Sequence, residues 1–155
     1  THFGLEATQI WKWMLETVHA QDPKKLLFSE YVQLVASFSL LSNKELGRFV
    51  FGAFDTAGRC LLKKDQFEEI IRVHLEGTDR SARLFFSQFD NYFNPALKGV
   101  LFTSFEAFVA SNPIMLWGIQ FIQLKLREHN LGMPFWFRKM EQFRLVRKEL
   151  GIQQR

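Results

Sequence analysis

The sequence has little of several residues that organise folds and sites. It contains one cysteine, Cys60, with four prolines and nine glycines among 155 residues. A single cysteine excludes an internal disulfide, so we expect a reducing compartment. Sparse proline and glycine leave no stretch with the composition of a flexible linker. No charge-free apolar run reaches about 18 residues, the length that a membrane-spanning helix needs. We therefore expect a soluble, cytoplasmic protein.

Patterns of catalysis are also missing. The sequence has no glycine-rich phosphate loop, and Cys60 forms no recognisable motif with a histidine. Ligands on one helix need an i, i+3 or i, i+4 spacing, and the histidines lack it. They are His2, His19, His74 and His129. We therefore expect no enzymatic activity within these residues.

Apolar and aromatic residues are abundant. Hydrophobic residues make up 47% of the chain, which includes 18 phenylalanines and argues against disorder. Such rings fill a core or line a groove, and the core is the commoner place. The formal charge of +4 is concentrated from Leu131 to Arg155, a segment that contains six lysines and arginines and two glutamates. So local a charge argues against a broad nucleic-acid-binding face.

Apolar residues recur with helical periodicity along most of the chain. A first helix is predicted to end at Asp22-Pro23, and its apolar stripe is Ile10, Trp11, Met14, Leu15 and Val18. The segments predicted to follow are residues 31–38, Ser42 (as a cap) to Phe54, Lys64 to about residue 77, and one capped by Asp79 or Ser81. The sequence therefore predicts an all-α fold.

Two internal repeats interleave along the chain. Residues 26–37 align with residues 100–111, with identical or similar residue types at most positions. Between them, the motif Phe-x-x-Phe-Asp occurs at residues 51–55 and again at residues 86–90. Interleaved repeats of this kind predict one helix-loop-helix unit that is used several times.

The second motif resembles the EF-hand superfamily, in which Phe-x-x-Phe-Asp is typical of the junction between the entering helix and its calcium loop. The family places an aliphatic residue at loop position 8, which corresponds here to Leu26, Leu62 and Val100. An aromatic residue then opens the next helix, as Tyr31, Phe67 and Phe105 would. The resemblance implies EF-hand-like pairs joined by a short backbone pairing through the three aliphatic residues.

The resemblance covers about residues 5 to 127 and is similar in style to the calcineurin B, neuronal calcium sensor and calcineurin B-like group. Phe28-Ser29-Glu30-Tyr31 and Asn112-Pro113-Ile114-Met115-Leu116 carry that similarity. Three hands are visible, and a fourth register near residues 129–140 stays open. The implied organisation is a first EF-hand-like pair at residues 1–77, a third unit with an apolar C-terminal helix at residues 78–132, and a basic amphipathic tail helix at residues 133–155.

The loops lack most calcium ligands. Calcium needs oxygen ligands at loop positions 1, 3, 5, 7, 9 and 12. In the loop that starts at Asp55, these places hold unsuitable residues, namely Ala57, Arg59, Lys63 and Gln66. The first loop keeps Glu30 at position 12 beside poor ligands, so we expect Glu30 to be a solvated residue that opens a helix. Asp90, Asn94 and Ser104 are weak candidates in the third loop. We expect no cofactor and no calcium dependence.

A hydrophobic groove is the functional site that the resemblance implies. EF-hand lobes hold an amphipathic helix of a partner in such a groove. The residues predicted to line it are Phe38, Phe49, Phe51, Ile70, Phe86 and Phe108. We therefore expect a non-catalytic protein-binding module, an adaptor or scaffold, that works largely without calcium.

The C-terminal segments supply helices that fill such a groove or contact a partner. From Pro113 to Arg127 the apolar residues cover most of the circumference, beside one polar stripe. After a break at Gly132 and Pro134, a basic amphipathic helix follows. The candidate contact residues are Trp117, Phe121, Trp136, Met140 and Phe143. Contact of residues 136–150 with a membrane surface is a less favoured alternative.

Two other functions stay open at the level of sequence. One is a calcium-responsive regulatory module of a larger enzyme or channel, with residual binding around Asp90. The other is a structural subunit of a cytoskeletal or ciliary assembly. A loop with carboxylates at positions 1, 3 and 12 would favour the first of these alternatives, and the sequence lacks one.

Overall fold

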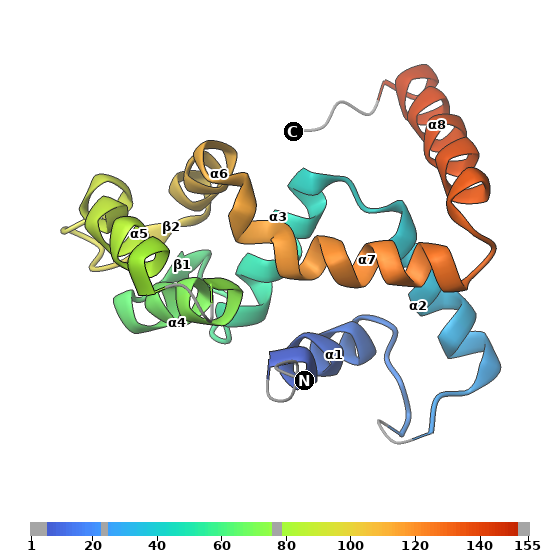
Figure 1. The fold of residues 1–155 in the computed structure, drawn as a ribbon, viewed down its shortest axis with the longest axis horizontal. Coiled ribbons are helices and arrows are strands. Elements are labelled where there is room, and N and C mark those ends of the chain that lie inside the picture. The colour runs from blue at the N-terminus through green and yellow to red at the C-terminus, as the bar shows by residue number, and fades with distance from the viewer. Residues whose placement is uncertain (1–5, 23–24, 76–78, 152–155) are drawn as a thin grey trace. The chain divides into compact units, whose positions relative to one another are not determined.

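The computed structural model describes the backbone of residues 6–22, 25–75 and 79–151, and the side-chain surroundings of residues 12–22, 25–71 and 85–151 (Figure 1). Within this part lie eight α-helices, a 3-10 helix and a two-stranded sheet, which confirms the all-α prediction. The elements are α1 (Glu6–Thr17), α2 (Phe28–Leu40), α3 (Asn43–Phe54), β1 (Leu61–Leu62), α4 (Lys64–Leu75), α5 (Asp79–Tyr92), β2 (Val100–Leu101), α6 (Phe102–Ser111), η1 (Pro113–Leu116), α7 (Trp117–His129) and α8 (Met133–Glu149).

The chain divides into two compact units. The first comprises residues 1–13 and 42–120, and the second comprises residues 14–41 and 121–155. The first unit therefore contains α3 to α6 with η1, and the second contains α2 and α8. The boundaries fall within α1 and α7.

Two helix-loop-helix segments of the first unit are joined through their loops. β1 follows α3, β2 follows α5, and the two strands pair antiparallel with Leu62 opposite Val100. Of the three residues expected to pair, Leu26, Leu62 and Val100, the last two pair with each other, and both of their side chains are fully buried. Gly99 makes the close approach possible, because a Cβ atom there would lie 2.6 Å from the Leu62 carbonyl oxygen.

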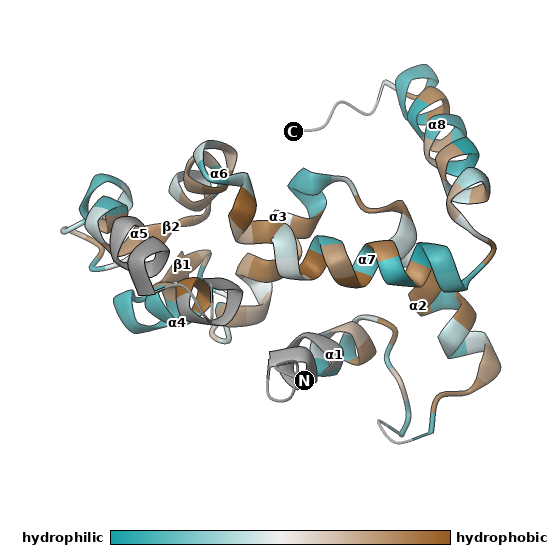
Figure 2. Cartoon of the chain, in the orientation of Figure 1, coloured by the Kyte–Doolittle hydropathy of each residue, from teal (hydrophilic) through white to brown (hydrophobic). Residues whose placement is uncertain are grey.

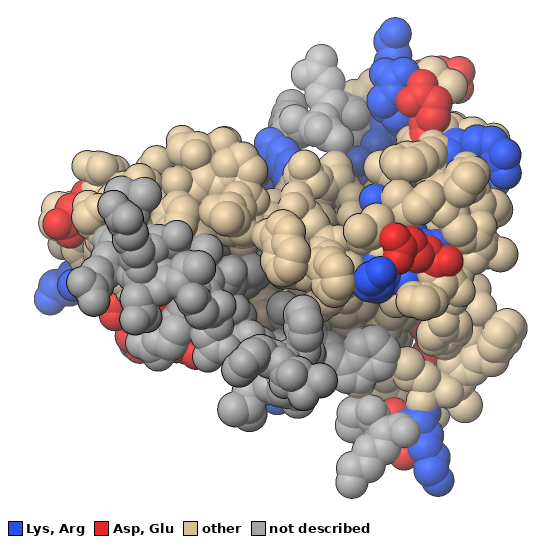
Figure 3. All heavy atoms as spheres, viewed as in Figure 1, with Lys and Arg blue, Asp and Glu red and all other residues tan. Residues whose placement is uncertain are grey.

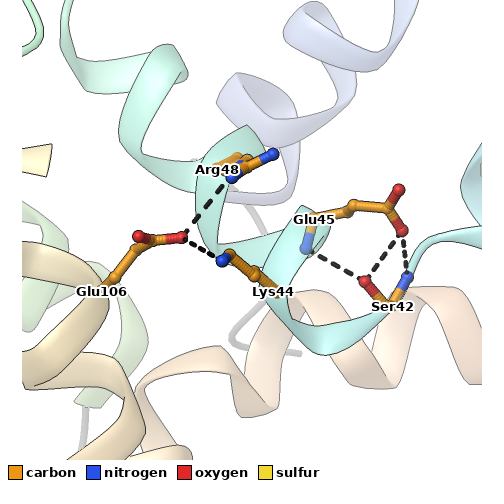
Figure 4. Close-up of polar contacts among 5 residues, drawn as sticks. All are labelled: Ser42, Lys44, Glu45, Arg48 and Glu106. Atoms are coloured by element: carbon orange, nitrogen blue, oxygen red, sulfur yellow. Dashed lines mark hydrogen bonds and ion pairs between the residues drawn. The ribbon is translucent and has the colours of Figure 1, made fainter. Parts of the chain in front are cut away.

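Local capping explains where the helices begin. At the start of α3, the Ser42 hydroxyl accepts the Glu45 backbone N–H at 3.3 Å, and the Glu45 carboxylate accepts the Ser42 backbone N–H at 2.8 Å (Figure 4). This capping box confirms Ser42 as the predicted cap, and α3 ends at Phe54 as predicted. α4 begins at Lys64, as predicted. α5 begins at Asp79 itself, one of the two residues predicted to cap it, and the side chains of Asp79 and Ser81 lie outside the described surroundings.

Aromatic rings form the core of the first unit. Phe67, Phe105 and Phe108 are at most 1% exposed. The Phe67 ring centroid lies 4.9 Å from that of Phe108 and 5.2 Å from that of Phe89, in tilted or edge-on contact. Edge-to-face contacts of this kind add about 0.5–1.5 kcal/mol each beyond the burial of apolar area. The interpretation of the phenylalanines as core residues is confirmed for this cluster.

The second unit has its own core and an internal polar layer. Leu34, Val35 and Phe38 of α2 and Trp136 of α8 are at most 5% exposed. The chain turns into α8 at Gly132, whose φ is 75°, so the predicted break is present. α7 mixes polar and apolar residues along its length (Figure 2). In a helix this apolar, the few polar residues would be expected to face water. The predicted polar stripe of α7 is nevertheless partly internal, because Gln123 is 4% exposed.

Candidate functional site

A groove of about 560 Å³ opens beside α3 and α6 in the first unit. Helix α3 contributes residues from its first turn and a half, and α6, η1 and the start of α7 supply the rest. The lining residues are Asn43, Lys44, Gly47, Phe105, Glu106, Ala107, Val109, Ala110, Pro113, Leu116 and Gln120. Most of them are apolar or small, as is usual in sites that take up another molecule's side chains.

Small residues give the groove its depth. Gly47 lies in the interior of α3, and a Cβ atom built on it meets no other atom within 4 Å. Ala107 and Ala110 line the same groove from α6. Glycine inside a helix costs about 0.5–1 kcal/mol relative to alanine. The first unit therefore carries a destabilising residue at the place where a larger side chain would fill the groove.

A charged cluster borders the groove. The Glu106 Oε1 atom lies 3.7 Å from Lys44 Nζ and 3.8 Å from Arg48 Nε (Figure 4). Both distances exceed hydrogen-bond length. Oε1 is buried and has no hydrogen-bond partner among the residues that the structure describes. The Glu106 carboxylate is therefore held between two cationic side chains by charge attraction.

A second polar contact also lines the groove. The Gln120 amide nitrogen donates to Asn43 Oδ1 at 3.1 Å, and both side chains are solvent-accessible. Between these polar groups the walls are formed by Phe105, Val109 and Leu116. The site thus combines an apolar interior with hydrogen-bonding groups at defined places, which suits a ligand with one apolar and one polar face.

The six residues predicted to line a groove lie elsewhere. Phe51, Ile70 and Phe108 are core residues of the first unit, and Phe38 is 2% exposed in the core of the second. Phe49 and Phe86 are partly buried, and none of the six lines the groove beside Gly47. Large aromatic side chains bury more apolar area in a core than at a groove wall. The signal that sequence reasoning missed is the cluster of small residues in two amphipathic helices.

The predicted contact residues of the C-terminal helices are spread over different environments. Trp117 of α7 is 55% exposed and Phe143 of α8 is 43% exposed, whereas Trp136 is a core residue of the second unit. Phe121 and Met140 are partly buried. The five residues therefore differ in exposure, and Trp117 belongs to the first unit whereas the other four belong to the second.

α8 presents a basic surface with apolar side chains. Lysine and arginine side chains lie over this helix, with acidic ones beside them (Figure 3). The Arg147 guanidinium lies 4.6 Å from the Phe143 ring centroid, a cation–π contact, and Val146 and Leu150 are exposed. No single helix of the described part is long and apolar enough to cross a membrane, and α6 with η1–α7 qualify only together, across a sharp bend.

In the loop after α3, side chains form hydrogen bonds with backbone groups of the same loop and its flanking residues. The Asp55 carboxylate is 8% exposed and accepts the backbone N–H groups of Arg59 at 3.1 Å and Cys60 at 2.6 Å. Gln66 donates its amide to the Phe54 carbonyl at 2.6 Å and accepts the Lys63 backbone N–H at 2.9 Å. Side chains at the first and twelfth loop positions therefore hold backbone groups of the chain itself.

Glu30 corrects one expectation. It opens α2 as predicted, but it is buried at 8% exposure rather than solvated. Its carboxylate accepts the backbone N–H of Gln21 at 3.1 Å and that of Leu27 at 2.9 Å. Hydrogen bonds to an ionised group are about twice as strong as neutral ones, which favours this burial. Glu30 therefore fixes the loop before α2 by the same means that Asp55 uses.

The third loop is also tied by internal hydrogen bonds. Asn94 Oδ1 accepts the Leu97 backbone N–H at 3.0 Å, and the backbones of Asn94 and Gly99 form an isolated bridge. Asp90 is exposed and Ser104 is partly buried in α6. In the described residues no group of three histidine, cysteine, aspartate or glutamate side chains gathers as metal ligands do. The weak candidacy of Asp90, Asn94 and Ser104 for calcium stays a prediction.

No family model, no curated protein and no solved structure matches this chain.

Proposed function

We propose that this chain is a non-catalytic protein-binding module that holds an amphipathic helix of a partner in the groove beside α3 and α6, without requiring calcium. The observation that carries the proposal is Gly47, where the interior of a helix opens into unfilled space. Around it lie apolar walls and the Glu106 carboxylate, which forms ion pairs with Lys44 and Arg48.

A helix is the ligand that this groove favours. Partner helices in such grooves insert apolar side chains spaced i, i+3, i+4 and i+7, and a few buried anchors supply most of the binding energy. The space at Gly47 and Ala110 suits one such anchor. A lysine or arginine one turn away on the partner would be attracted to the Glu106 carboxylate, whose side chain is 29% exposed, so that charge as well as shape selects partners.

The loops support calcium independence. Asp55 and Glu30 each accept two backbone N–H groups, so these carboxylates already stabilise their loops without an ion. Arg59 and Lys63 place positive charge where the resemblance would require ligands. We retain the EF-hand resemblance as part of this proposal, supported by the repeats and by the pairing of Leu62 with Val100. A cytoplasmic location is likewise proposed.

Two glycines of α3 provide a matched test. Gly47 lines the groove, whereas Gly52 is exposed on the same helix, and a Cβ atom at either position meets nothing within 4 Å. Helical peptides selected by display on the full chain are titrated by fluorescence anisotropy against Gly47→Leu and Gly52→Leu. We expect Gly47→Leu to weaken binding at least about tenfold, equivalent to about 1.4 kcal/mol.

The control variant decides the interpretation. Gly52→Leu should bind the selected peptides like the unsubstituted chain, and chelating calcium should change neither affinity. Circular dichroism verifies that both variants keep their helix content. Equal binding by the two variants would show that the peptides occupy another surface and would refute the groove as the site.

A further inference from the structure

The two copies of the longer repeat have different surroundings. Residues 26–37 lead into and form most of α2, and residues 100–111 do the same for β2 and α6. Because residues 26–37 and 100–111 are alike in sequence, we expect equivalent side chains of the two copies to make equivalent contacts. Only the second copy makes those contacts within the described part of the chain.

In the second copy, a neighbouring helix-loop-helix segment covers the motif. Val100 and Leu101 pair with β1. The Phe102 ring lies 5.1 Å from Phe51, and Phe105, 1% exposed, lies 5.4 Å from the same ring. A strand and an aromatic side chain of the preceding segment thus cover the start of α6.

In the first copy, the equivalent side chains are half-exposed or exposed, although the Tyr31 hydroxyl donates a hydrogen bond to Asn130 Oδ1. Leu27 is 53% exposed and Phe28 is 82% exposed, in the places of Leu101 and Phe102. Tyr31 and Val32, one turn further along α2, are 38% and 47% exposed. Among the residues that the structure describes, no strand pairs with residues 25–28. We call Leu27, Phe28, Tyr31 and Val32 the α2 patch.

The pairing of β1 with β2 has a two-fold character. Leu62 faces Val100, and each residue stands two places after a residue with a φ of 54°, Cys60 in one loop and Lys98 in the other. Equivalent positions of the two loops therefore face each other. Two identical loops can form the same arrangement across a true two-fold axis, because such an interface is self-complementary.

We propose that a second copy of this chain covers the α2 patch, with the loops before α2 paired antiparallel so that Leu26 of one copy faces Leu26 of the other. The exposed fractions of the four patch residues amount to roughly 400 Å² of side-chain surface per copy, given about 150–250 Å² for a whole aromatic side chain. Two copies bury about twice that area. Stable interfaces bury about 1,200–2,000 Å² in total, so the dimer is weak and concentration-dependent.

This dimer is independent of the groove proposed as the partner site. The α2 patch belongs to the second unit, whereas the groove residues belong to the first. Failure of either proposal therefore leaves the other standing. A chain that binds helices and pairs with itself would present two grooves per assembly.

Sedimentation velocity of the full chain over a wide concentration range tests the proposal. We expect the weight-average mass to rise from 18.3 kDa toward twice that value. Phe28→Glu should remain monomeric at every concentration. Leu150→Glu, at a position that is 67% exposed beyond α8, should dimerise like the unsubstituted chain. A chain that stays monomeric throughout would overturn the proposal.

Disulfide trapping tests the register. In a Cys60→Ser background, Leu26→Cys should form a disulfide-linked dimer on mild oxidation, because directly opposed strand residues have Cα atoms about 4.5–5.5 Å apart. Lys25→Cys is the matched control. Its two copies would face residue 27 instead, at a separation too long for a disulfide. Dimers that form without preferential crosslinking at position 26 would mean that another surface associates, and the proposal would be wrong.

Discussion

The guanidinium of Arg127 donates two hydrogen bonds to the carbonyl oxygen of Ser39, at 2.9 Å from Nε and 2.7 Å from Nη2. Gln123, one turn earlier on α7, donates to the carbonyls of Phe38 and Leu41 at 2.8 and 2.9 Å. Burial lowers the pKa of the Arg127 guanidinium, which still carries its charge at neutral pH. A positive charge at the C-terminus of α2 also complements the helix dipole. Two polar residues of α7 thus cap α2 within the second unit.

Replacing Arg127 should therefore destabilise the protein. Arg127→Met keeps most of the packing volume but leaves the Ser39 carbonyl without its donor, and hydrogen bonds to charged groups contribute about 1.5–3 kcal/mol. We expect a loss of about 2 kcal/mol in urea unfolding. Lys125→Met, which removes an exposed ion pair with Glu128, should cost less than about 1 kcal/mol. Equal losses in the two variants would contradict the capping role.

The carboxylate of Asp55 should matter for stability and not for calcium. Asp55→Ala removes the charged acceptor of the Arg59 and Cys60 backbone N–H groups, and hydrogen bonds to charged groups contribute about 1.5–3 kcal/mol. Thermal unfolding in calcium and in chelator should give the same midpoint for the unsubstituted chain. A site of micromolar affinity would instead add about 4 kcal/mol at millimolar calcium, a shift that is easily measured. Such a shift would overturn calcium independence.

Gly99 and Gly52 should respond oppositely to alanine. Gly99→Ala places a methyl group 2.6 Å from the Leu62 carbonyl oxygen, so β1 and β2 must separate, and overpacking of this kind costs about 1–3 kcal/mol. Gly52→Ala meets no atom within 4 Å inside a helix and should stabilise the protein by about 0.5–1 kcal/mol. Denaturant unfolding of both variants measures the contrast. If both substitutions changed the free energy of unfolding in the same direction, the strand pairing would not constrain position 99.

Features with local causes could be predicted from the sequence. Ser42 and Glu45 stand three residues apart and satisfy each other's backbone groups, so the start of α3 follows from a short segment. Leu62 and Val100 could be predicted as pairing residues because the repeats place equivalent residues in equivalent loops, but the sequence does not say which two of Leu26, Leu62 and Val100 pair. Both features depend on spacing along the chain more than on the surroundings.

Features that depend on packing could not be predicted. Gln123 and Arg127 form a polar stripe on α7, and only the position of the carbonyls at the end of α2 makes that stripe internal. Glu30 is buried because the loop before α2 brings the backbone N–H groups of Gln21 and Leu27 to its carboxylate. From the sequence alone, Gly47 indicates only a residue that destabilises a helix. Its place in a groove becomes clear only in the structure, where Ala110 of α6 lines the same groove.

Amide chemical shifts of the full chain, recorded by NMR while a selected helical peptide is added, test the central claim most directly. The account predicts that the resonances of Gly47, Ala107 and Ala110 move, while those of Gly52 and α8 stay in place. Shifts concentrated on α8, with Gly47 and Ala110 unchanged, would contradict the groove as the binding site.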